Sequence, residues 1–140
     1  MTTPWKHYQE DWLLFTEAGF IAVNQADEDT AVKLFKAGEL LNPDNVLPQI
    51  GFGYLHLHKL ELKQAVHIFE KVVEKEPHND MAKAFLGLCM GLMPNMVGKS
   101  EKILEKTAHS AEDPLVKNLA ETSLEFIEKY VKKTPGPAGK

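Results

Sequence analysis

The residues that could carry catalytic or metal chemistry are few and poorly grouped: six histidines and one cysteine. His56 and His58 are two residues apart, so on a helix their side chains point in different directions. No histidine pair has an i, i+4 spacing, and no HExxH, glycine-rich phosphate loop or nucleophile elbow is present. We therefore predict no metal site, no catalytic residue and no cofactor, and interpret the histidines as scattered surface or half-buried side chains.

Cys89 lies in the most apolar segment of the chain, Ala84 to Met93. A thiol in such a segment is more often a small core side chain than a nucleophile, and we predict a core position. A single cysteine excludes an internal disulfide and a cysteine-based zinc site, and it suits a reducing cytoplasm. An enzyme that uses Cys89 with a histidine is the alternative.

Charge and composition narrow the classes of partner. The chain of 140 residues has a net charge of −4, and all 16 of its Lys and Arg residues are lysines. Without arginine it lacks the usual bidentate reader of phosphate and guanine, so nucleic-acid binding is disfavoured. The longest apolar run is too short for a bilayer, which needs about 20 residues, and no secretion signal is visible near the N-terminus. These observations favour a protein partner and a cytoplasmic location.

Several residue types recur along the chain at one fixed offset of 34 residues. They are Gly19, Gly53 and Gly87; Ala31 and Ala65; Phe35 and Phe69; Pro43 and Pro77; Asn45 and Asn79. A period of 34 with an apolar-Gly step, a later Ala-x-x-x-Phe and a closing proline is the tetratricopeptide repeat (TPR) signature. The sequence resembles this repeat from about Trp12 to Ala111. The resemblance implies an all-α fold, a TPR superhelix of three helix pairs with a C-terminal capping helix.

The repeat predicts the organisation of the chain as a single TPR domain over residues 1–134. Its repeats are about 12–45, 46–79 and 80–111, followed by a capping helix over 114–132 and a disordered tail over 135–140. The expected helices span about 4–25, 28–41, 46–58, 62–75, 80–92, 98–110 and 114–132. In the third repeat Lys99 and Ala111 stand where alanine and proline are expected. The register of its second helix is therefore left open.

The recurring residues have distinct physical roles in such a repeat. Each helix pair is unable to bury its apolar face alone and must stack on its neighbour. Glycine and alanine allow the two helices of a pair to approach closely, and Phe35 and Phe69 are expected to fill the space between one helix pair and the next. Prolines end the second helix of a pair. Asn45 and Asn79 are expected to cap the following helices, and Asp113 with Pro114 is expected to begin the last one.

The first helix of each pair carries more apolar residues than one stack needs. In the first repeat we expect the stack to use Leu14, Phe15, Ala18, Ile21 and Ala22. The surplus residues are Leu13, Phe20 and Val23; Leu47, Ile50, Tyr54 and Leu57; Met81, Ala84, Leu88 and Leu92. By the repeat resemblance these positions line the concave side, which gives an apolar groove suited to an amphipathic helix rather than to a peptide carboxylate. Alternatively, these residues are core, or are covered by the chain's own ends or by a second copy.

Aromatic residues at helical spacing begin before the first repeat. Trp5, Tyr8 and Trp12 precede Phe15, and no earlier repeat exists to bury them. Exposed aromatics are typical of partner surfaces. The segment is either such a surface or a cap that folds back on the first repeat.

A short acidic TPR protein with an apolar groove and a closing helix resembles the cytoplasmic chaperones of bacterial type III secretion. The segment "LEKTAHSAEDPLVKNLAETSLEFIEKY" is similar to the end of the subclass that guards the needle subunit, with Ala111-Glu112-Asp113-Pro114 as the step into the last helix. The resemblance implies that the groove holds an amphipathic helix of a self-polymerising secreted protein. It also implies that Trp5, Tyr8 and Trp12 contact a small helical co-chaperone.

Two related interpretations stay open. The first two repeats are closer to the TPR consensus than is usual in the subclass that guards the needle subunit, which leaves room for a chaperone of the type III translocator proteins. The chain could also be a general TPR adaptor whose convex face carries Lys63, Lys71 and Lys75. Whether the free protein forms a homodimer through its groove is likewise open.

Overall fold

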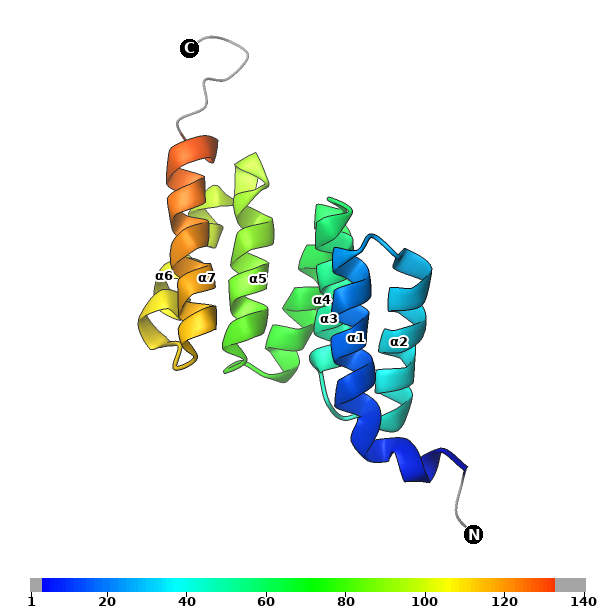
Figure 1. The fold of residues 1–140 in the computed structure, drawn as a ribbon. Coiled ribbons are helices and arrows are strands. Elements are labelled where there is room, and N and C mark those ends of the chain that lie inside the picture. Colours follow the sequence, from blue (N-terminus) through cyan, green and yellow to red (C-terminus); the bar gives the residue numbers. More distant parts are fainter. Residues whose placement is uncertain (1–3, 133–140) are drawn as a thin grey trace. The chain divides into compact units, whose positions relative to one another are not determined.

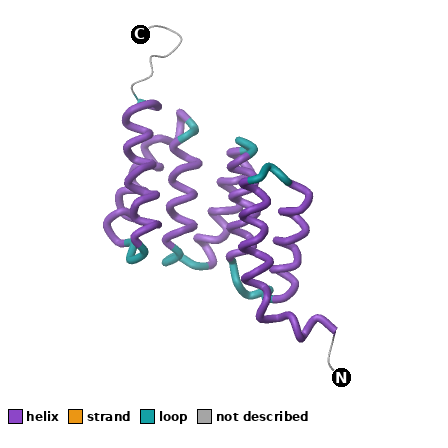
Figure 2. Tube along the Cα trace, viewed as in Figure 1, coloured by secondary structure: helices purple, strands orange, loops and turns teal. Residues whose placement is uncertain are grey.

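The computed structural model of the protein describes residues 4–132, and the side chains of residues 8–132. Within this range helices joined by short turns and loops make up the secondary structure, and no strand occurs (Figure 2). The helices, labelled in Figure 1, are α1 (Trp12–Asn24), α2 (Glu28–Leu41), α3 (Leu47–His58), α4 (Leu62–Lys75), α5 (Asp80–Gly91), α6 (Val97–Ser110) and α7 (Pro114–Phe126). The chain divides into two compact units, Met1–Val72 and Val73–Lys140, and each is described by itself. The predicted all-α class is confirmed.

Most helices have the predicted bounds, but the first and the last helical segments differ from the prediction. α2 and α4 have the predicted limits, and α3, α5 and α6 differ from theirs by one residue. The predicted helix over 4–25 is wrong at its start, because Pro4–Asp11 forms a 3₁₀ helix, η1. This segment contains no aliphatic residue apart from proline, so it lacks the apolar stripe that would hold further α-helical turns on the core. At the other end α7 continues as a short π-helix, η3 (Ile127–Val131).

Phe35 is the centre of the core of the first unit. Its ring is fully buried and meets the ring of Phe20 at 5.3 Å and that of Phe52 at 5.4 Å, both edge-on. A Cβ on Gly19 would lie 2.5 Å from Phe35 Cε1, and one on Gly51 would overlap the same ring. The two glycines therefore give the ring its space. Because the ring touches both α1 and α3, it lies between the first helix pair and the next, as the repeat predicts. In the next repeat Gly53 stands in the same relation to Phe69, at 2.6 Å.

The second unit resolves the register of the third repeat. A Cβ on Gly87 would lie 2.6 Å from the side chain of Leu104, which is fully buried. Leu104 follows Phe69 by 35 residues rather than 34, so α6 is displaced by one residue from the repeat period. Ser100 takes the position of Ala31 and Ala65, and its hydroxyl donates to the Gly87 carbonyl at 2.6 Å. Leu104 then packs with Ala120 and Ile127 of the last helical segment.

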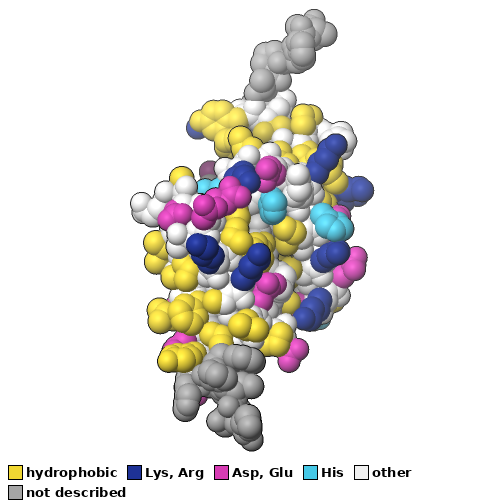
Figure 3. All heavy atoms as spheres, turned by 90° about the vertical axis from the view of Figure 1, so that its right-hand side faces the viewer, with side chains coloured by type: hydrophobic (Ala, Val, Ile, Leu, Met, Phe, Trp, Pro, Cys, Tyr) yellow, Lys and Arg dark blue, Asp and Glu magenta, His cyan; other side chains and the backbone are white. Residues whose placement is uncertain are grey.

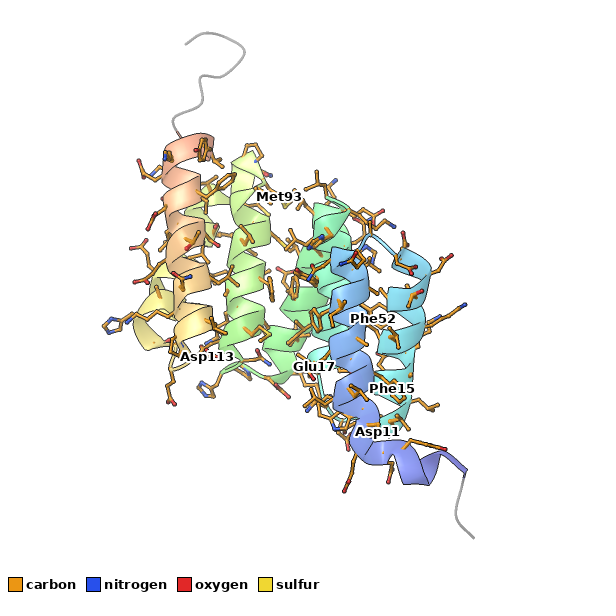
Figure 4. The ribbon with its side chains drawn as sticks, in the orientation of Figure 1. Asp11, Phe15, Glu17, Phe52, Met93 and Asp113 are labelled. Atoms are coloured by element: carbon orange, nitrogen blue, oxygen red, sulfur yellow. The ribbon has the colours of Figure 1, made fainter. Side chains whose placement is uncertain are left out.

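Two of the predicted capping residues, Asn79 and Asp113, are confirmed as N-caps, whereas the N-cap of α3 is Val46 rather than Asn45. Asn79 Oδ1 accepts a hydrogen bond from the Ala82 amide at 2.9 Å, at the start of α5. Asp113 Oδ1 accepts one from Leu115 at 2.9 Å, with Pro114 in the first turn of α7 (Figure 4). Asn45, which precedes the N-cap of α3 by one residue, accepts a hydrogen bond from the Leu47 amide at 2.9 Å. Each bond satisfies an amide that the helix itself leaves without a partner.

The faces of α1 and α3 differ from the prediction at four residues. Leu14 and Ile21, expected in the stack, are each 62% exposed. Val23 and Ile50, expected in the groove, are only 3% and 1% exposed and belong to the core. The reason is that α1 is apolar on all sides, with Glu17 as its only charged residue, so its sequence does not distinguish the core face from the outer face.

The turns between paired helices hold two non-glycine residues in the left-handed region, Ala26 with φ 60° and Leu60 with φ 59°. In the second turn the Glu61 amide bonds back to the His56 carbonyl and the Leu60 amide to the Leu57 carbonyl, closing the end of α3. Glu61 Oε1 also lies 2.7 Å from His56 Nδ1, and this hydrogen bond lowers the pKa of the Glu61 carboxyl. The backbone amides of the turn are therefore hydrogen-bonded, although Leu60 has a strained left-handed conformation.

We expect Leu60→Gly to raise the free energy of unfolding by about 0.5–1 kcal/mol, because glycine removes the left-handed strain. Little packing is lost, since the Leu60 side chain is 71% exposed. The control is Leu115→Gly, which replaces another exposed leucine inside α7 and is expected to cost about 0.5–1 kcal/mol. Urea denaturation followed by circular dichroism compares the two, and a lower stability of Leu60→Gly would contradict the strain.

Candidate partner-binding surface

The predicted groove residues of the first unit lie on α1 and α3. The two helices pack side by side, and Phe20 of α1 and Tyr54 of α3, which are 34 residues apart, meet between them. The rings of Phe20 and Tyr54 meet at 5.2 Å, with their planes tilted by 50°. Both side chains are half-buried and pack against the Phe35 core on one side. The structure therefore brings together two of the residues predicted for the groove.

Polar groups border this aromatic pair, and sequence reasoning missed them. The Tyr54 hydroxyl donates to Asn24 Oδ1 at 2.7 Å, and the Tyr54 ring meets the His58 ring at 4.5 Å. Burial raises the pKa of the Tyr54 phenol, partly offset by the hydrogen bond to Asn24. Asn24 and His58 are themselves 34 residues apart, so the same offset that revealed the repeat could have found them.

The remaining predicted groove residues have mixed exposure. Leu13 on α1 is 41% exposed, while Leu47 and Leu57 on α3 are half-buried. Val23 and Ile50 are buried in the core and are removed from the candidate surface. In the second unit Met81, Leu88 and Leu92 are half-buried on α5 or at its end. Ala84, also predicted for the groove, is fully buried in the core and is removed from the candidate surface. We call Leu13, Phe20, Leu47, Tyr54 and Leu57 the α1–α3 surface.

The N-terminal aromatic residues are only partly described. The side chain of Trp5 lies outside the described residues. Tyr8 is exposed and Trp12 is half-buried at the start of α1. Their assignment to a co-chaperone stays a prediction.

Comparisons with family models, with curated proteins and with solved structures found no match to this chain. The chemistry of the candidate surface therefore rests on its own residues. Among the described residues no group of histidine, cysteine, aspartate and glutamate side chains is placed to hold a metal ion. Within the same range, no helix is both long and apolar enough to cross a bilayer.

Cys89 is a core residue, as predicted, and its side chain is fully buried in α5. Burial raises the pKa of its thiol to about 12. The thiolate, which is the nucleophilic form, is therefore scarce near neutral pH. This environment gives no support to a catalytic role.

We expect the Cys89 thiol to react with Ellman's reagent only as the protein unfolds, because the native thiol is both buried and protonated. The measurement compares reaction rates at mildly alkaline pH in native buffer and in concentrated guanidinium chloride. A Ser110→Cys variant, whose new thiol is exposed at the end of α6, gives the rate of an accessible cysteine. Rapid modification of the native wild-type protein would show that Cys89 is accessible and reactive.

Proposed function

We propose that the chain is a TPR protein that binds an apolar helix of another protein on the α1–α3 surface. The observation that supports this is the contact between Phe20 and Tyr54, two half-buried aromatic residues from equivalent positions of successive repeats. Their outer faces, and exposed Leu13 two turns earlier on the same stripe of α1, present apolar surface without a charged group of their own. Such a surface fits the apolar side chains of an amphipathic helix at i, i+3, i+4 and i+7.

Polar groups at the edge of this surface would orient the bound helix. Asn24 and His58 lie against Tyr54 and can exchange hydrogen bonds with polar side chains at the helix margin. Apolar contacts would supply most of the affinity, and the polar rim would select the register. In the repeat pattern Met81, Leu88 and Leu92 are the equivalent positions of the third repeat, and they are proposed as partner contacts of the second unit by itself.

The finer proposal concerns the identity of the partner. By its resemblance to type III secretion chaperones, the chain acts in the bacterial cytoplasm and holds the amphipathic helix of a needle subunit, which prevents polymerisation before export. The step Ala111-Glu112-Asp113-Pro114 supports this, and Asp113 does begin the last helix by capping it. A translocator chaperone or a general TPR adaptor would use the same surface for a different client.

The test uses Tyr54→Glu and Leu13→Glu, which place a carboxylate on the α1–α3 surface. We expect both variants to lose binding of a peptide covering the C-terminal helix of a needle subunit, because a charge buried without a partner is costly. Tyr130→Glu is the matched control, since Tyr130 is an exposed tyrosine of the second unit, on η3. Calorimetric titration measures the affinity, and circular dichroism verifies that each variant folds.

The outcomes separate the alternatives. Loss of binding in both surface variants, with the control unchanged, supports the proposal. Binding that survives both variants but fails after charge reversal of Lys63 and Lys71 would assign recognition to the opposite side of the repeat, as in an adaptor. If a translocator peptide binds and the needle peptide does not, the α1–α3 surface remains the proposed binding site, and its client is a translocator protein instead of the needle subunit.

A further inference from the structure

Glu17 is the only charged residue of α1, and apolar residues surround it. On a helix the neighbours of a residue lie three and four positions away, which for Glu17 are Leu13, Leu14, Phe20 and Ile21. Leu13 is 41% exposed, Leu14 and Ile21 are each 62% exposed, and Phe20 is half-buried. Glu17 itself is exposed and is labelled on α1 in Figure 4. Its carboxylate therefore stands in the middle of an uncovered apolar patch.

The described part of the chain offers this carboxylate no counter-charge. Among residues 8–132, whose side chains the structure describes, Glu17 makes no hydrogen bond and no ion pair. Glu28 and Glu61, by contrast, each pair with Lys59, at 3.0 and 3.5 Å. α1 itself contains no lysine or arginine that could reach Glu17 along the helix. In the free protein the charge therefore depends on water for its solvation.

The second repeat shows this position when another helix covers it. The residue 34 positions after Glu17 is Gly51 of α3, which is buried against the Phe35 ring of α2. A Cβ there would already overlap the ring, so no carboxylate fits in the same place. In the third repeat the equivalent residue is half-buried Phe85. A partner that covers α1 therefore meets a charge that α2 does not meet on α3.

We propose that Glu17 selects a partner helix that carries a lysine or arginine within its apolar face. This inference rests on the proposed binding of a helix to the α1–α3 surface. Glu17 is four residues after Leu13 and three before Phe20, both of which belong to that surface, so a helix bound there passes beside the carboxylate. Covering an unpaired carboxylate with apolar groups is costly, and a basic side chain of the partner removes that cost by pairing with it. The exposed leucines beside Glu17 offer apolar surface along which the methylene stem of such a side chain can lie.

The charge of the chain agrees with a basic partner residue. The net charge of −4 favours the approach of a basic segment over that of an acidic one. Hydrophobic side chains gather along the left edge of Figure 3, the edge toward the front of Figure 1, while Lys and acidic side chains mix across its centre. An ion pair covered by apolar contacts is screened less by salt than pairs among such mixed, exposed charges. A single carboxylate on an apolar patch can therefore discriminate strongly between partner helices.

Selection from a displayed library of amphipathic helices tests the proposal without a known client. Each helix carries leucine at i, i+3 and i+7 and any residue at i+4, and the full chain is the immobilised target. We expect lysine and arginine at i+4 to be enriched at least about tenfold over aspartate and glutamate. Glu17→Lys should reverse this preference, and Glu17→Gln should remove it. Glu121→Lys, at an exposed glutamate of α7, changes the net charge as Glu17→Lys does and should select the same helices as the wild type.

A charge swap between the two partners measures the pairing directly. Calorimetric titration compares a selected peptide that has lysine at i+4 with the same peptide that has glutamate there. On the wild-type protein we expect the glutamate peptide to have a dissociation constant at least about tenfold higher, and on Glu17→Lys we expect the order to be reversed. Circular dichroism verifies that each variant folds, as expected for a substitution at an exposed position.

The outcomes separate this role of Glu17 from the binding function itself. If Tyr54→Glu abolishes the selection but basic residues are not enriched, the α1–α3 surface keeps its proposed function and Glu17 has no selective role. A basic preference that Glu17→Gln leaves unchanged would also overturn the role of Glu17. If the wild type selects no helix, or if Tyr54→Glu selects the same helices as the wild type, the proposed function fails and the role of Glu17 fails with it.

Discussion

Phe35→Ala is expected to lower the free energy of unfolding by about 3–5 kcal/mol, the largest effect of any single substitution in the first unit. Phe35, on α2, is fully buried and contacts residues of two other helices, Gly19 and Phe20 of α1 and Gly51 and Phe52 of α3. The two glycines cannot fill the space left by the ring, because they have no side chain to move into it. The cavity therefore stays open, and its full cost is felt.

Urea denaturation followed by circular dichroism measures this loss. Phe126→Ala is the matched control, because Phe126 is a partly exposed phenylalanine at the end of α7, and its removal is expected to cost about 1 kcal/mol or less. Equal losses in the two variants would show that Phe35 does not hold the two helix pairs together. Phe35→Leu, which refills part of the space, is expected to recover a part of the lost stability.

Gly53→Ala is expected to destabilise the protein by about 1–3 kcal/mol, although alanine is the better helix former. A Cβ on Gly53 would lie 2.6 Å from the Phe69 ring, which is fully buried and has little freedom to shift. Gly98→Ala is the matched control. A Cβ on Gly98, in the first turn of α6, meets nothing within 4 Å, so this substitution is expected to add about 0.5–1 kcal/mol.

The two glycine variants are compared by their midpoints of thermal or urea unfolding. Opposite signs are expected, because one site has a neighbouring ring and the other has open space. If Gly53→Ala stabilises the protein as much as Gly98→Ala does, the close approach of the helices at Phe69 is not a packing requirement. The recurrence of glycine at positions 19, 53 and 87 would then lack its physical explanation.

Local signals of the sequence predicted much of the local structure. The bounds of α2 and α4 follow from polar turns and prolines, and Asn79 and Asp113 cap helices as expected. The place of Phe35 between the first helix pair and α3 follows from the repeat, because the offset identifies Phe35 and Phe69 as equivalent residues that fill the space between pairs. These features depend on neighbours within one or two helices, which a periodic pattern can specify.

Other features could not be predicted from the pattern alone. In an apolar helix such as α1, periodicity does not tell which stripe is covered, so the pattern places Leu14 inside and Val23 outside, and the structure has them reversed. In the third repeat the displacement of α6 by one residue is hidden, because Ser100 replaces the alanine that marks the register. The identity of a partner depends on a second molecule, which one sequence does not contain.

The central claim is that the α1–α3 surface holds the partner helix, and site-specific photo-cross-linking tests it most directly. A benzophenone side chain is placed at position 24, beside Tyr54 on the surface, and in a second variant at position 71, an exposed lysine of α4. With a peptide that spans the C-terminal helix of a needle subunit, we expect a cross-link from position 24 and none from position 71. A cross-link from position 71 alone would contradict the claim.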